Sequence, residues 1–73
     1  MTRVRLERKR RRMTAWALAL QARVHPSDLS KIEAGRLRPT AEQAHRIAEA
    51  LGLPVETVFD HRGWPLEAEL EVV

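Results

Sequence analysis

Apolar residues recur at helical spacing along much of the chain, most clearly in its second half. There, four of them fall at i, i+3, i+4 and i+7, which is one face of an α-helix: Ala44, Ile47, Ala48 and Leu51. Residues 40–43, Thr-Ala-Glu-Gln, fit a capping box at the start of this helix, and Gly52 suits its end. The pattern predicts a helix over residues 41–51 with one buried face.

Two shorter helices are predicted upstream. Thr14 can cap a helix over residues 15–22, which are rich in Ala and Leu and therefore favour helix. After a short connection, Pro26 suits the first position of a helix over residues 26–34, which Gly35 can end.

The two ends of this region complete a five-helix, all-α domain. Residues 3–12 form a basic helix candidate, and the apolar residues between 53 and 59 suggest a short last helix that closes the core. The predicted organisation is one helical domain over residues 1–59 followed by a tail over residues 60–73.

The tail has a different pattern. Its apolar residues alternate with glutamates, which predicts a strand whose inner face would be Leu66, Ala68, Leu70 and Val72. Leu66, Leu70 and Val73 also lie at helical spacing, so a helix remains open as the alternative. We expect Trp64 and Pro65 to anchor the tail on the domain.

Size and composition exclude several classes of protein. The 73 residues suffice for one domain, and the absence of cysteine excludes disulfides and thiolate metal sites. The three histidines have no companions at metal-ligand spacing, so we expect no metal and no cofactor. No apolar run approaches the ~20 residues that a membrane span needs, and a cytoplasmic location is expected.

Charge is unevenly distributed along the chain. Residues 1–38 hold eleven Lys or Arg against three Asp or Glu, whereas residues 39–73 hold two against seven. The first half therefore has a net charge of +8 and the second half −5. Such an asymmetry favours a nucleic-acid-facing end.

The helix predicted over residues 26–34 combines an apolar face with a small polar, cationic face. Leu29 and Ile32 point inward at this spacing, while Ser27, Ser30 and Lys31 point outward. Hydroxyls and an ammonium on a narrow helix are suited to hydrogen bonding with base edges in the major groove of DNA.

The order of these elements resembles the phage repressor and Cro-like helix-turn-helix family, of the xenobiotic-response-element type, over about residues 3–59. The matching residues are Thr14, Leu18, Ala19, Val24, residues 27–33, Gly35, Pro39 and residues 46–53. The resemblance implies a lambda-repressor-like five-helix domain whose third helix enters the major groove of double-stranded DNA.

The resemblance also implies roles for individual residues. Those facing the bases would be Pro26, Ser27 and Lys31, and those touching phosphates would be Arg36, Arg38 and Thr40. Arg8 would form a structural ion pair with Glu33.

The chain departs from the family pattern at two positions. Ala15 stands where a phosphate-binding Gln is frequent, and Arg23 stands where the turn usually has Gly, so Arg23 must accept a positive φ or use another turn. For the neighbouring Trp16 we expect a half-buried ring lying over the first helix, with a partner surface or a phosphate contact as the alternative.

These observations favour a transcriptional regulator, with repression as its expected mode, that occupies a palindromic operator as a homodimer held together by the tail. The alternative is an antitoxin-type protein whose tail binds a partner protein and whose DNA-binding half serves autoregulation. An enzyme is not expected, because His25, Ser27 and Asp28 lie within one helical turn on different faces and cannot form an oriented triad.

Overall fold

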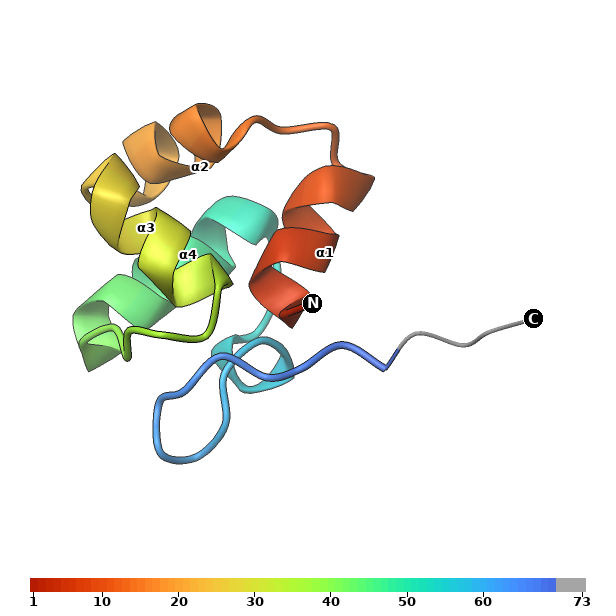
Figure 1. The fold of residues 1–73 in the computed structure, drawn as a ribbon, viewed down its shortest axis with the longest axis vertical. Coiled ribbons are helices and arrows are strands. Elements are labelled where there is room, and N and C mark those ends of the chain that lie inside the picture. The colour runs from red at the N-terminus through yellow and green to blue at the C-terminus, as the bar shows by residue number, and fades with distance from the viewer. Residues whose placement is uncertain (70–73) are drawn as a thin grey trace.

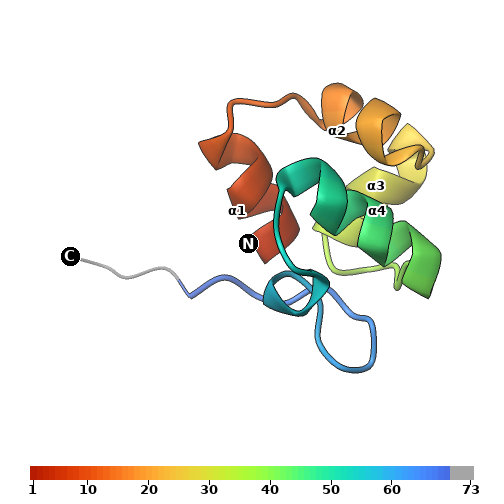
Figure 2. The same cartoon turned by 180° about the vertical axis from the view of Figure 1, so that it is seen from behind.

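The computed structural model describes residues 1–69, so the predictions for Leu70 and Val72 lie outside the described residues. The described part is helical, as predicted, and its elements are shown in Figures 1 and 2. They are α1 (Arg3–Arg10), α2 (Ala15–Ala22), α3 (Pro26–Glu33), α4 (Ala41–Leu51) and the 3-10 turn η1 (Val55–Thr57).

Threonine side chains start three of the four α-helices. Thr2, Thr14 and Thr40 each accept a hydrogen bond from a backbone N–H in the first turn that follows. Thr40 completes the predicted capping box, because its own N–H donates to Gln43 Oε1 at 2.9 Å. Gly52 ends α4 in the left-handed conformation with φ 72°, also as predicted.

One apolar core joins all four α-helices and the segment after η1. Helix α4 contacts α1, α2 and η1, while α3 packs on α1 and α2. The largest fully buried apolar side chains are Val4, Leu18, Leu29, Ile32, Ile47 and Val58. Each such side chain contributes about 1.5–3 kcal/mol of burial free energy, and together they fix the position of α3 on the domain.

The prediction of five helices is wrong, because the last one is only the 3-10 turn η1. Pro54 precedes this turn, and the Thr57 hydroxyl donates to the Pro54 carbonyl at 2.7 Å. Directly afterwards Phe59 forms a β-bridge with Pro65, which requires extended backbone. The apolar residues Val58 and Phe59 still close the core, as expected from the sequence.

Two arginines adopt positive φ angles at helix ends. Helix α1 stops two residues short of the predicted end, and Arg12 lies at φ 54° in the connection to α2. Arg23 ends α2 in the left-handed conformation at φ 55°, so this position accepts the strain that glycine would avoid. Arg46 supports that turn from α4, since its Nε donates to the Ala22 carbonyl at 2.8 Å.

The tail is neither the strand nor the helix that the sequence predicted. Residues 65–68 are extended but paired only through isolated bridges, Phe59 with Pro65 and Thr2 with Glu67. The Leu66 N–H donates to the Val58 carbonyl at 2.9 Å, and the Leu66 carbonyl accepts from the Arg3 N–H at 2.8 Å. Figure 1 shows the segment running beside the N-terminus.

This pairing changes the argument for the tail as a dimerisation element. We expected the tail to hold a homodimer together, but the backbone of Leu66 is bonded on both sides within its own domain. Leu66 and Ala68 are half-buried there. Trp64 anchors the approach, because Asp60 Oδ1 accepts its backbone N–H at 2.9 Å, a bond that also lowers the pKa of Asp60.

No helix within residues 1–69 combines the length and the apolar character that crossing a membrane requires.

Candidate nucleic-acid interface

Helix α3 separates buried and exposed residues as its spacing predicted. Leu29, Ile32 and Glu33 are buried against the domain. Ser27, Ser30 and Lys31 are exposed, at i, i+3 and i+4, and Pro26 is half-buried at the first helical position. The exposed stripe therefore presents two hydroxyls and one ammonium on a single helical face.

His25 caps α3, a role that the sequence reading missed. Its Nδ1 accepts the Ser27 backbone N–H at 3.1 Å and lies 2.8 Å from Ser27 Oγ. Nδ1 accepts the backbone N–H with its single lone pair, which the Ser27 hydroxyl can share, and the hydroxyl oxygen keeps a lone pair open as an acceptor. Histidine is not among the usual capping residues, but Pro26 at the first helical position marked residue 25 as the cap.

The loop after α3 carries the residues expected to touch phosphates. Arg36 and Arg38 are both exposed, and Arg38 Nη1 lies 3.4 Å from the Arg62 carbonyl oxygen, a long hydrogen bond. Thr40 is exposed at the start of α4, where its hydroxyl oxygen accepts the Gln43 N–H at 3.1 Å. The Thr40 hydroxyl proton remains able to donate to an anion.

Several exposed cations without carboxylate partners lie on α3 and the segments around it. Within the described residues, the ion pairs leave out Arg23, Lys31, Arg36 and Arg38 here, and Lys9, Arg12 and Arg62 elsewhere. In the basic run of α1, Arg10 and Arg11 both pair with Glu7, at 3.1 and 2.8 Å. The hydrogen bond from Arg11, followed by the charge of Arg10, lowers the pKa of Glu7.

The structure brings Arg8 and Glu33 together, as the family resemblance implied. Arg8 Nε lies 2.9 Å from Glu33 Oε2, and Arg8 Nη2 lies 3.0 Å from Oε1. Arg5 adds a third contact at 3.3 Å, which the sequence reading did not include. The last residue of α3 is thus held by two arginines of α1.

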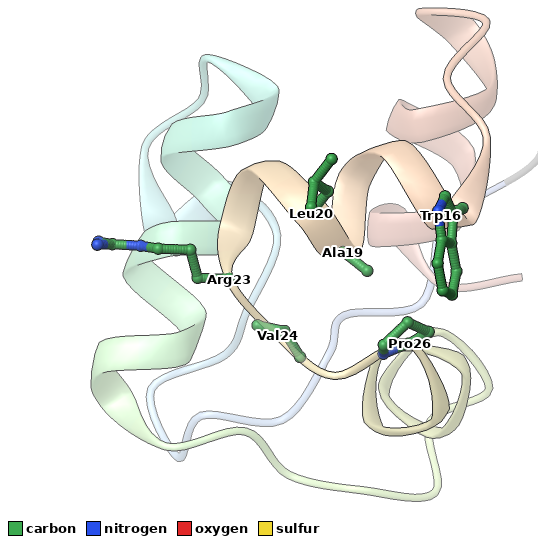
Figure 3. Close-up of a pocket in the computed structure, with 6 residues that line it drawn as sticks. All are labelled: Trp16, Ala19, Leu20, Arg23, Val24 and Pro26. Atoms are coloured by element: carbon green, nitrogen blue, oxygen red, sulfur yellow. The ribbon is translucent and has the colours of Figure 1, made fainter.

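Trp16 does not lie over α1, and that expectation was wrong. Its side chain is 69% exposed on α2, and Figure 3 shows the indole directed from α2 toward Pro26 at the start of α3. The two rings border a shallow hollow of about 280 Å³ between α2 and α3, lined also by Ala19, Leu20, Arg23 and Val24.

Comparison with known protein families identifies the family of this chain. A family model described as a helix-turn-helix domain matches residues 2–59, which is most of the chain. The matched range includes α1 to α4 and η1, and therefore every residue of the exposed α3 face. The search against curated proteins returned no match for this chain.

Proposed function

The chain belongs to the helix-turn-helix domain family, and from this premise we propose that it is a sequence-specific regulator of transcription that binds double-stranded DNA. The observation that carries the proposal is the exposed face of α3, with Ser27, Ser30 and Lys31 presented beside unpaired cations. The proposed role is binding without catalysis, and the protein acts as a repressor by occupying its operator.

In this proposal α3 lies in the major groove. Lys31 donates to guanine O6 and N7, a contact worth ~1–3 kcal/mol of discrimination against other bases. Ser27 and Ser30 bond to neighbouring base edges or phosphates. Arg36, Arg38 and the Thr40 hydroxyl neutralise or bond phosphates, which sets the register of α3 on the duplex without reading sequence.

We further propose that the operator is palindromic and is bound by a homodimer. One α3 helix reads only a few base pairs, and two half-sites about one helical turn apart, ~34 Å, would supply the missing specificity. Leu66 and Ala68 are bonded within one chain, so a dimer interface at these two residues would have to use their side chains rather than the bonded backbone groups.

Selection of bound duplexes from a random DNA pool tests the proposal. We expect a symmetric motif with two half-sites, and no enrichment of a motif would reject sequence-specific binding. Ser30→Glu places a negative charge on the exposed α3 face without touching the core, and it should abolish binding. Gln21→Glu makes the same charge change at an exposed position of α2 and is the matched control.

Light scattering tests the dimer separately. The full chain is expected to be dimeric, and a chain ending after Glu69 keeps the bonds of residues 65–68 while removing Leu70 and Val72. A dimer that becomes monomeric on this truncation supports the tail as the interface. A dimer that survives the truncation shows that Leu70 and Val72 are not required, and leaves the interface at Leu66 and Ala68 or on another surface.

A further inference from the structure

Trp16 and Pro26 form an apolar element at the edge of the proposed DNA-binding face. Trp16 stands in the first turn of α2 and Pro26 is the first residue of α3. The indole is 69% exposed, and it points at the Pro26 ring across the hollow between the two helices (Figure 3). Ser27, a proposed DNA contact, is the next residue along α3.

The chemistry of this hollow fits an apolar group. Its floor comes from the buried Ala19 and Val24, and the guanidinium of Arg23, its one charged lining residue, is directed away from Trp16 and Pro26 (Figure 3). Pro26 has no backbone N–H to donate, so its ring offers apolar contact only. A duplex bound by the cations around α3 would place the edges of its bases next to Trp16 and Pro26. No separate ligand is needed to fill the hollow.

We propose that Trp16 and Pro26 contact the 5-methyl group of a thymine, and so act as specificity-determining residues for DNA. The inference rests on the proposed function, because it requires α3 in the major groove. Among the base edges of that groove, only thymine presents a methyl group. The indole face of Trp16 and the pyrrolidine ring of Pro26, at the N-terminal end of α3, are suited to enclosing such a methyl group.

The direction of the neighbouring apolar residue favours DNA over a protein partner. Leu20 is 75% exposed one turn along α2 and also lines the hollow, but Figure 3 shows the end of its side chain directed away from α3, whereas Trp16 leans toward it. The exposed end of Leu20 is therefore not part of the surface that Trp16 shares with Pro26. The Trp16–Pro26 element is instead continuous with the exposed face of α3.

The first arm of the test replaces each thymine of the selected duplex by uracil in turn and measures affinity by fluorescence anisotropy. Uracil lacks only the methyl group, so it reports this contact without altering base pairing. At one position in each half-site the unaltered protein should bind about fourfold more weakly, the value expected for one buried apolar carbon.

The second arm repeats the measurement with variants of Trp16. Trp16→Ala should remove the difference between thymine and uracil at that position, and Trp16→Phe should restore part of it. Leu20→Ala is the matched control, because it deletes an equally exposed apolar side chain of the same helix and should keep the difference. Circular dichroism of each variant verifies that the helices are intact.

The outcomes separate the inference from the function on which it rests. If the unaltered protein binds no duplex with sequence preference, the proposed function fails and the inference fails with it. If the unaltered protein binds but Trp16→Ala keeps both its affinity and its response to uracil, only the inference is overturned. It is also overturned if no thymine position responds to uracil, and a change of oligomeric state in both Trp16→Ala and Leu20→Ala would then assign this surface to a protein contact.

Discussion

Arg8 and Glu33 form a two-pronged ion pair between α1 and the last residue of α3, with N–O distances of 2.9 and 3.0 Å. Glu33 is 2% exposed, and a third N–H of Arg8 donates to the Met13 carbonyl at 2.8 Å. The guanidinium therefore connects α1, the connection after it and α3. The pair fixes the C-terminal end of the proposed reading helix.

Loss of this carboxylate should destabilise the domain. Glu33→Ala leaves Arg8 with an uncompensated, largely buried charge, which typically costs ~3–5 kcal/mol. Urea denaturation measures the free energy of unfolding, and Glu49→Ala, at an exposed position of α4, is the control. A Glu33→Ala variant as stable as the control would show that the pair contributes little.

Mutations of a base-contacting residue and of a phosphate-contacting residue should have different effects on DNA affinity and specificity. Lys31→Ala should weaken binding to the selected duplex by ~1–3 kcal/mol and relax specificity at one base position. Arg38→Ala should weaken binding to all duplexes alike and lower the slope of log K against log salt by about one. Lys9→Ala, at an exposed position of α1, is the control. An unchanged sequence motif for Lys31→Ala would mean that α3 is placed wrongly on the DNA.

Glu7 should make stability depend on acid pH. Its pKa is lowered in the folded domain, first by the hydrogen bond from Arg11, so it stabilises the fold above its ordinary pKa. That contribution is lost as the pH falls through the lowered value. Glu7→Gln should cost about 0.5–1 kcal/mol at neutral pH, and the difference from the unaltered protein should shrink as the pH falls below the ordinary glutamate pKa of 4.5. A difference that stays constant with pH would contradict this origin.

Removal of the tail should weaken the helical domain itself. A chain ending after Gly63 loses the Leu66 bonds to Val58 and Arg3 and the bond from the Ala68 N–H to the Met1 carbonyl. With the packing of Leu66, we expect a loss of about 2–4 kcal/mol. Thermal unfolding compares this chain with one ending after Glu69, which keeps those bonds. Equal melting temperatures would show that the tail pairing is energetically neutral.

Local signals account for what was predicted correctly about the fold. The start and end of α4 follow from Thr40, Gln43 and Gly52, whose effects act within one turn. The end of α1 was misplaced because the arginine run contains no residue that usually stops a helix, and Arg12 takes a positive φ without being glycine.

Non-local contacts account for most of what was missed. The alternation in the tail correctly indicated extended backbone near residue 66, but one of its bridge partners is Thr2, at the opposite end of the described chain. The same holds for the site. The exposed face of α3 follows from its spacing, whereas the direction of Trp16 depends on where the turn places Pro26.

The pairing of residues 66 and 68 with the first residues of the chain has a consequence for the order of folding during synthesis. Helices α1 to α4 are complete once Leu51 has been made, but the Arg3 N–H and the Met1 carbonyl must wait for residues 66 and 68 to pair. Contacts of such large separation form late, because their loop-closure entropy must be overcome first. On the ribosome, the Arg3 N–H and the Met1 carbonyl would therefore stay without these partners until residues 66 and 68 have left the exit tunnel.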